Sequence, residues 1–378
     1  ILGVAAAMRV AVVAAPPYLS SDLYRYLWDG RVIAAGINPY RYIPADPSLA
    51  GLRDPAIYPN INRANYAHTI YPPAAEAIFF AVTRLGESPI AVKAAMVGFE
   101  AVAVLLLLRL LVLSGQPPTR IVIYAWHPLP LWEFAGSGHI DATIVALVAL
   151  ALWSRRRWTQ GWVAGLALAG ATLVKLYPAV ILPALWRRWD WRLPAIFAAA
   201  MILAYLPFAE VGWRVFGFLP DYLAEEGFTG RGAGFYLWDV ARLASPQVHL
   251  SEVAYLVPAA ALLVALAGFV AQRRPHPDAD IRGAALLAGA FTLLVSPHYP
   301  WYFAWLVVFA CVVPSVALIW LTLASFLLYL EPVWPQLMQS RPWLVVQSAL
   351  YLPFLGLAIV ELRRHLREEA LHDERAAG

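Results

Sequence analysis

Residues 193–209 read LPAIFAAAMILAYLPFA, an apolar run without a single charged side chain. Comparable runs of about 15 to 25 residues recur from one end of the chain to the other and end at Arg, Pro or Gly. A helix needs about 20 mostly apolar residues to cross the hydrocarbon layer of a bilayer. The runs therefore predict a chain that crosses a membrane many times.

The composition excludes a soluble protein. Hydrophobic residues make up 61% of the 378 residues and charged residues 14%, and the mean hydropathy is +0.62. Soluble domains are about half apolar and about a quarter charged, because a globular surface needs polar cover. The Trp and Tyr residues gather near the ends of the apolar runs, where amphipathic rings meet lipid headgroups. We expect an all-α polytopic membrane protein surrounded by membrane lipids.

Basic residues set the expected orientation, because positively charged loops face the cytoplasm. The net charge of +4 is gathered in short clusters between apolar runs, which favours membrane loops over a nucleic-acid surface. The clusters are Arg155-Arg156-Arg157, Arg187-Arg188, Arg273-Arg274 and Arg363-Arg364. A threading with about 11 to 12 membrane helices and both termini inside brings all four clusters to the cytoplasmic side. After a first run over 1–15, the helices are expected near 89–113, 120–135, 140–154, 161–174, 176–186, 193–209, 252–271, 283–297, 301–314, 315–331 and 342–361.

Residues 1–378 are expected to form one transmembrane domain with its chemistry on the outer face. The outer side carries two long insertions, 17–88 and 210–250, and loops of such length are usually functional. Residues 74–85 are apolar but too short to span, which indicates an interfacial helix. The short runs 161–174 and 176–186 indicate a half-depth hairpin that opens outside. The first run is short and contains Arg9, so we expect a truncated N-terminus.

The first outer loop opens with SSDLYRYLWDGR over residues 20–31. Asp22 follows the first helix within a few residues, and a carboxylate at the membrane boundary is suited to act as a base or ligand. The alternative is that Asp22 only begins an interfacial helix as its cap. Asp29 lies on the same helical face and is a second candidate acid, or forms an ordinary ion pair with Arg25 or Arg31.

A second polar stretch, GSGHID over residues 136–141, lies between two apolar helices on the outer side. His139 and Asp141 there are candidates to bind a sugar hydroxyl or a phosphate of the substrates. Two ligands are too few to predict a metal site. The alternative is a turn in which Asp141 begins the next helix. Tyr71, in the rigid Tyr71-Pro72-Pro73 bend, is a further candidate for sugar or acceptor binding.

Lys175 ends an apolar stretch, and a charge in that place usually has an anionic partner. Snorkelling of its side chain to the interface is the alternative. His298 and Tyr302 lie in SPHYPWY at another outer helix end, where they could hold a phosphate and a sugar or form an aromatic belt. Glu133 and Glu210 are weaker candidates near outer helix ends. The chain contains no phosphate-binding Gly-rich loop, HExxH or CxxC array, so nucleotide chemistry is not expected. We expect no cofactor, and a metal is not required because cationic side chains are already available to a phosphate.

Four stretches, in order, resemble the GT-C glycosyltransferases. The first runs from SDLY at 21–24 through GINPY at 36–40 to TIYPP at 69–73, and the others are GSGHID at 136–141, VKLYP at 174–178 and SPHYPWY at 296–302. The sequence is most similar to bacterial polyprenyl-phosphate-mannose-dependent mannosyltransferases of the glycosyltransferase family 87 type. The resemblance covers nearly the whole chain, although no single motif is specific.

The resemblance implies a GT-C fold in a bacterial inner membrane, with the active site on the extracytoplasmic face. It implies an inverting transfer of a hexose, commonly mannose, from a polyprenyl-phosphate donor to a lipid, glycan or protein acceptor. Asp22 matches the general base of that family, and Asp29 has a counterpart as a second acid. Lys175 and His298 match positions near the donor phosphate. Arg25 and Arg31 from their charge, and Tyr302 from its place beside His298, are expected to assist them.

Two other functions remain open from the sequence. A transporter or lipid flippase would carry charges midway along its helices, whereas here they gather at outer helix ends. A non-catalytic scaffold in envelope assembly would tolerate the loss of all the candidate site residues.

Overall fold

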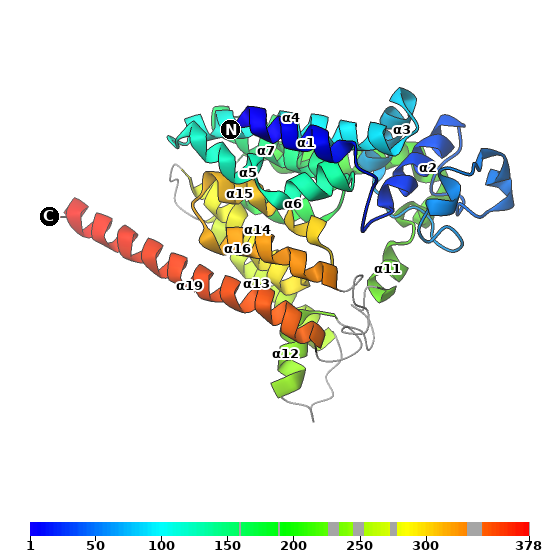
Figure 1. The fold of residues 1–378 in the computed structure, drawn as a ribbon. Helices are drawn as coiled ribbons and strands as arrows, with labels where there is room; N and C mark the ends of the chain where they lie inside the picture. Colours follow the sequence, from blue (N-terminus) through cyan, green and yellow to red (C-terminus); the bar gives the residue numbers. More distant parts are fainter. Residues whose placement is uncertain are drawn as a thin grey trace.

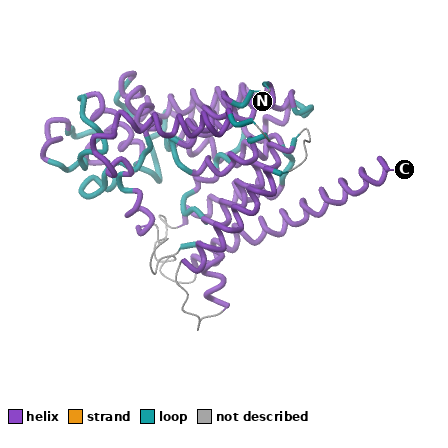
Figure 2. Tube along the Cα trace, turned by 180° about the vertical axis from the view of Figure 1, so that it is seen from behind, coloured by secondary structure: helices purple, strands orange, loops and turns teal. Residues whose placement is uncertain are grey.

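The computed structural model describes residues 1–158, 160–187, 190–225, 234–244, 253–272, 278–330 and 342–377. Every regular element in these ranges is a helix, as predicted (Figure 2). The predicted cluster Arg273-Arg274, Arg188, and residues 226–233 and 245–250 of the second insertion lie outside the described residues.

The first insertion folds as a compact helical cap at one end of the bundle, at the right of Figure 1. Its two main helices, α2 and α3, pack closely against each other because Gly30 of α2 has no side chain to separate them: a Cβ there would lie 2.4 Å from Phe79 O. The Pro72-Pro73 pair begins α3, where a missing N–H costs nothing. The cap contains α2 (Asp22–Ala34), η1 (Pro47–Leu52), η2 (Tyr58–Asn60) and α3 (Pro73–Leu85), and α1 (Leu2–Val13) precedes it and packs against the bundle.

Four helices in the described ranges are long and apolar enough to cross a membrane. They cover Pro89–Leu113, Arg192–Tyr222, Ala254–Ala271 and Trp343–Arg364. The corresponding elements are α4 (Pro89–Leu113), α10 (Arg192–Tyr205) continued by η6 (Leu206–Phe216) and α11 (Leu219–Glu225), α13 (Val253–Ala271) and α19 (Pro342–Ala377). The polytopic membrane architecture is thereby confirmed, while spans beyond these four stay a prediction.

The core lies around α7 (Asp141–Arg157), which packs against α4 and against α8 (Trp162–Thr172). Nearly every α7 side chain from Asp141 to Leu152 is buried, because neighbouring helices cover it on all sides. Arg9 of α1 is also buried, and it is neutralised by Glu100 of α4 at 2.7 Å. That ion pair explains the single charge in the first apolar run.

Several predicted helices are broken. Residues 118–136 form η3 (Pro118–Ile121), α5 (Val122–Ala125), α6 (Pro128–Pro130) and the π-helix η4 (Leu131–Gly136) in place of one helix over 120–135. Prolines at 118, 128 and 130 explain the breaks, because each lacks an N–H for the helical ladder. The remaining elements are η5 (Tyr177–Ile181), α9 (Leu182–Leu185), α12 (Tyr236–Ala244), α14 (Ala279–Val295), η7 (Pro300–Phe303), α15 (Leu306–Val312), α16 (Val316–Ala324) and η8 (Ser325–Tyr329).

The helical turns that follow α10 are kinked at Gly212 and again at Gly217, which have φ values of 58° and 54°. The extent of the second insertion, 210–250, stays a prediction.

The cap is tied to the bundle through the backbone. The N–H groups of Ala74 and Ala75, in the first turn of α3, both donate to the carbonyl of Leu173, at 3.1 and 3.2 Å. Leu173 follows directly after α8. Its carbonyl has no hydrogen-bond partner within that helix and instead accepts from N–H groups at the start of α3, which likewise have no partner within their own helix. The break between α8 and η5, residues 173–176, is therefore fixed against the cap.

Candidate active site

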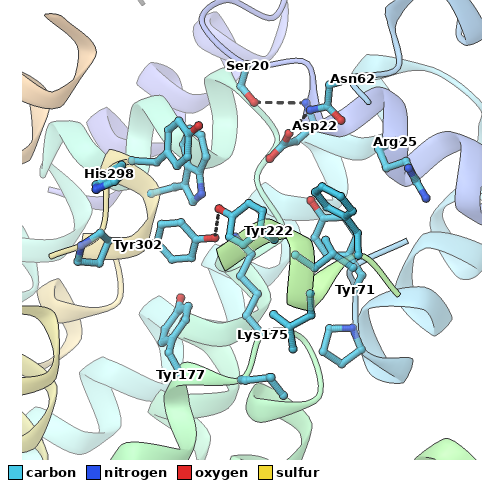
Figure 3. A pocket seen from close by; sticks show the side chains of 18 of the residues that line it. Ser20, Asp22, Arg25, Asn62, Tyr71, Lys175, Tyr177, Tyr222, His298 and Tyr302 are labelled. Atoms are coloured by element: carbon cyan, nitrogen blue, oxygen red, sulfur yellow. Dashed lines mark hydrogen bonds between the residues drawn. The ribbon is translucent and has the colours of Figure 1, made fainter. Parts of the chain in front are cut away.

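A cavity of about 530 Å³ opens between the cap and the ends of the bundle helices (Figure 3). The first loop, α2, the break after α8, α11 and the segment 295–305 all contribute to its wall. Among the described residues that line it, Asp22 is the one carboxylate, and it faces several cationic or imidazole side chains. Those side chains are Arg25, Arg63, His68, Lys175 and His298.

Asp22 is the first residue of α2, and its carboxylate points into the cavity (Figure 3). Its Oδ1 accepts a hydrogen bond of 2.6 Å from Asn62 Nδ2, while its backbone N–H donates to Ser20 Oγ at 3.3 Å. No side chain caps the start of α2. The carboxylate of Asp22 is therefore held by one amide and remains partly open to the cavity.

Lys175 lies in the break after α8, where the chain leaves the helical ladder and can aim a side chain into the cavity. Its Nζ is 2.6 Å from Asp141 Oδ2 and 4.7 Å from the ring centroid of Tyr302. Burial lowers the pKa of Lys175, but the Asp141 carboxylate and the Tyr302 ring raise it, and the net shift is upward. The ammonium group therefore stays charged beside the cavity.

Asp141 is fully buried and does not line the cavity. Its Oδ1 accepts a hydrogen bond of 3.0 Å from the Tyr177 hydroxyl, and its Oδ2 pairs with Lys175. It begins α7 but makes no side-chain cap. The structure thus places Asp141 behind Lys175, one side chain away from the substrate space.

His298 and Tyr302 belong to one bend at the end of α14. Ser296 takes a left-handed conformation there, with φ 49°, and ends the helix so that the following residues turn along the cavity. His298 Nε2 is 3.4 Å from the carbonyl of Gly234, and the Tyr302 hydroxyl is 3.2 Å from that of Tyr222. Both side chains line the cavity, as Tyr71 does from the opposite wall (Figure 3).

Arg25 and Asp29 are paired one turn apart on α2. Arg25 Nε is 2.9 Å from both carboxylate oxygens of Asp29, and its Nη1 donates to the carbonyl of Ala67 at 3.1 Å. Arg25 reaches the cavity wall, whereas Asp29 is buried and does not. Arg31, on the outer part of α2, bonds Asp54 and Glu87 instead and does not line the cavity.

His139 is fully buried directly behind Asp22. Its Nδ1 is 2.9 Å from Glu133 Oε2, and its Nε2 is 3.0 Å from Ser20 Oγ and 3.9 Å from Asp22 Oδ2. Like Asp141, it contacts a residue of the cavity wall without lining the cavity itself. Glu210 pairs with Arg41 at 2.9 Å on the exposed surface and is not part of the site.

A sequence profile of glycosyltransferase family 87 matches residues 69–297, which is more than half of the chain. The chain belongs to glycosyltransferase family 87. No curated protein matches the sequence. Family 87 membership and the apolar helices together indicate a multi-pass membrane glycosyltransferase. An enzyme of this class needs a sugar donor and an acceptor, and the cavity is the place where the described residues could bring the two together.

The family 87 match includes Tyr71, Lys175 and the wall between them, but Asp22 and Arg25 precede it and His298 and Tyr302 follow it directly. The fold joins these three parts of the chain around one space. No group of three or more His, Cys, Asp or Glu side chains in the described ranges is arranged to hold a metal ion.

Sequence reasoning missed several residues of this glycosyltransferase site. Asn62, Arg63 and His68 line the cavity from the middle of the first loop, and Tyr222 lines it from α11. The polar stretch INRANYAH at 61–68 stands out among aromatics and prolines and could have been noticed. Nothing near Tyr222 in the sequence indicates that it meets Tyr302.

Proposed function

We propose that this family 87 enzyme transfers a hexose, mannose by resemblance, from a polyprenyl-phosphate donor to a lipid, glycan or protein acceptor. The transfer inverts the anomeric carbon, and Asp22 is the general base. The observation that carries the proposal is the single carboxylate of Asp22 facing Lys175, Arg25 and His298 across one cavity. A base opposite a group of cations is the arrangement that this reaction needs.

Asp22 takes the proton from the acceptor hydroxyl as that oxygen attacks the anomeric carbon. The bond between the sugar and the phosphate breaks, and its electron pair leaves with the polyprenyl phosphate. Lys175, Arg25 and His298 offset the charge that develops on the phosphate, and such stabilisation in a partly dry site is usually the largest contribution to catalysis.

The inverting outcome is supported by the wall of the cavity. A double displacement that retains configuration uses two carboxyl groups, one as nucleophile and one as acid and then base. A single displacement from a phosphate donor needs only one base. Asp22 is the one carboxylate among the described lining residues, so it serves as that base.

A lipid-linked donor is supported by the apolar part of the same cavity. Phe218, Leu219, Phe291, Val295 and Trp305 are among the residues that line it. Apolar walls with a few well-placed polar groups are typical of sites for amphipathic ligands. We assign the prenyl chain to these residues and the sugar phosphate to the polar end.

The remaining predicted site residues receive supporting roles in this proposal. Asp29 holds Arg25 and Asp141 holds Lys175, so that both cations keep a fixed place beside the phosphate. Tyr71 and Tyr302 are assigned to the sugar and the donor respectively. Arg31 is assigned to the stability of the cap, because its partners lie outside the cavity.

The test uses the purified full chain in detergent with polyprenyl-phosphate mannose carrying a radiolabel. Lipid extract from a strain that lacks the protein serves as the acceptor mixture. Asp22→Asn should reduce transfer by at least about 100-fold, the usual contribution of a general base. Asp46→Asn is the matched control, because Asp46 caps η1 in the same loop and Asn caps equally well.

Transfer by Asp22→Asn at the wild-type rate would remove Asp22 as the base. Movement of the labelled lipid across vesicles without covalent transfer would support a flippase instead. Comparison of lipids and glycans from the deletion strain and the wild type identifies the acceptor.

A further inference from the structure

We infer that Glu133 and His139 form a buried proton-accepting pair behind Asp22, which receives the proton that Asp22 removes from the acceptor. The inference rests on the proposed function of Asp22 and adds two positioning residues to it. It starts from the unusual depth of these groups: Glu133 and His139 are both fully buried, yet His139 reaches to 3.9 Å from the Asp22 carboxylate.

The hydrogen bonds fix the tautomer of His139. Glu133 Oε2 is 2.9 Å from His139 Nδ1, and the Tyr329 hydroxyl donates to Glu133 Oε1 at 2.6 Å. A carboxylate can only accept, so the ring proton lies on Nδ1 and Nε2 keeps its lone pair. This lone pair faces Ser20 Oγ at 3.0 Å and, next to it, Asp22 Oδ2. The base of the reaction therefore has a second, aligned base behind it.

The backbone around the pair is built for this geometry. Glu133 lies in the π-helix Leu131–Gly136, and π-helical turns are frequently found at functional sites. Gly138 follows with φ +75°, a value that favours glycine, and turns the chain so that His139 N–H bonds the Glu133 carbonyl at 2.9 Å. The two side chains are thus held together by main chain as well as by their own hydrogen bond.

The proton follows a balanced path. The acceptor O–H proton moves to Asp22 as the new bond to the anomeric carbon forms and the phosphate departs with its electron pair. Protonated Asp22 then replaces the Ser20 hydroxyl as the donor to His139 Nε2, and the proton passes to that nitrogen. The resulting imidazolium lies between Asp22 and Glu133, with the ring of Trp301 centred 4.1 Å away. After the product has left, the proton returns from His139 Nε2 to Asp22, which lines the cavity, and passes from Asp22 to water in the opened cavity.

This path differs from direct release of the proton from Asp22 into water. It returns Asp22 to its charged form before the product leaves, so reprotonation of the new glycosidic oxygen is prevented. A loss of the pair should therefore slow the chemical step and leave donor binding unchanged.

The experiment compares Glu133→Gln with the wild type in the transfer assay described above. We expect kcat to fall about 100-fold, within the usual range for proton-transfer groups, with donor KM within twofold. The ratio of kcat in H2O to kcat in D2O should rise, because the proton step becomes rate-limiting. Glu133→Asp should recover part of the rate. If Glu133→Gln does not yield folded protein, His139→Gln is assayed instead, with the same expected fall in kcat and rise in the isotope ratio.

Glu100→Gln is the matched control. Glu100 is equally buried and also contacts a tyrosine hydroxyl, that of Tyr124, but it pairs with Arg9 far from Asp22. It should lower the unfolding temperature and keep the wild-type isotope ratio in the folded fraction.

If Glu133→Gln keeps the wild-type kcat and isotope ratio while Asp22→Asn is inactive, the inference is overturned. The proposed function then remains intact. Covalent labelling of Ser20 by a fluorophosphonate would also overturn it, because Ser20, His139 and Glu133 would then form a nucleophilic triad. An inactive wild type would instead remove the proposed function itself.

Discussion

At the scale of single residues, each strong cation of the cavity wall is backed by a carboxylate outside the cavity. Lys175 is held by Asp141 at 2.6 Å, and Arg63 is held by Glu225 at 2.7 Å. Arg25 is held in the same way by Asp29. The carboxylate behind each cation fixes the direction of its side chain and offsets part of its positive charge. In the proposed reaction, a phosphate can therefore be held in place and still be released after the transfer.

We predict that Asp141→Asn is more destabilising than the double variant Asp141→Asn with Lys175→Met. Removal of one partner leaves a buried charge without compensation, which typically costs about 3–5 kcal/mol, whereas removal of both does not. Thermal unfolding in detergent measures the effect. If the free-energy changes caused by Asp141→Asn and Lys175→Met simply add in the double variant, the two side chains do not form this ion pair in solution.

We predict that Glu76 makes the cap less stable as the pH rises. Burial and then the nearby Asp29 charge raise the pKa of Glu76 well above 4.5, although hydrogen bonding from Thr69 and the charge of Arg25 act in the opposite direction. The folded state thus keeps a proton that the unfolded chain loses, so stability is greatest below pH 4.5 and falls as the pH rises through the folded pKa. Unfolding temperatures from pH 5 to 8 should fall less steeply in Glu76→Gln, and equal slopes would contradict the prediction.

The sequence could predict pairs that are close along one helix but not pairs across the fold. Arg25 and Asp29 are one helical turn apart, so their ion pair was an expected alternative. Lys175 and Asp141 were both candidate site residues, yet nothing in the sequence joins them, because only the packing of α7 against α8 brings them together. Arg31 is near Asp22 in the sequence, but the helix turns its side chain outward to Glu87.

At the scale of elements, the site depends on helices that stop or change pitch beside the cavity. The break after α8 presents Lys175, the π-helix before Gly138 presents His139, and the left-handed Ser296 presents the bend with His298. Apolar periodicity cannot show such interruptions, because every broken piece stays apolar. Prolines indicate some of them, as in residues 118–130.

We predict that Gly30→Ala disrupts the cap. An added Cβ would lie 2.4 Å from the Phe79 carbonyl of α3, so α2 and α3 must separate and Asp22 must move with α2. Transfer activity and the unfolding temperature should both fall. Gly51→Ala is the control, because a Cβ added to Gly51 would meet no neighbouring atom within 4 Å. Equal behaviour of the two variants would show that the close contact between α2 and α3 is not required.

At the scale of the whole molecule, the cavity and the described basic clusters lie at opposite ends of the bundle. Asp141 at the start of α7 contacts Lys175, and Arg157 at its other end is about 24 Å away at 1.5 Å per residue. Trp343 near the start of α19 contacts His298, while Arg363 and Arg364 lie about 30 Å further along that helix, whose end projects at the left of Figure 1. This polarity supports a cavity that opens away from the cytoplasm.

We predict the side of the membrane from cysteine labelling. Cys311 is the one cysteine of the chain and is buried, so the wild type should react weakly with a membrane-impermeant maleimide. Ser48→Cys in the cap should be labelled on intact cells, and Arg157→Cys only after the membrane is permeabilised. The reverse pattern would place the cavity in the cytoplasm.

The double hydrogen bond from α3 to Leu173 has a consequence for how substrates exchange. Because the start of α3 and the turn before Lys175 share this main-chain connection, the acceptor side and the donor side of that wall must shift as one body. Tyr222 and Tyr302, in contrast, join two other segments of the wall through their hydroxyl groups alone, at 3.2 Å. Under the proposed reaction, we expect substrate exchange to begin where these two tyrosines separate.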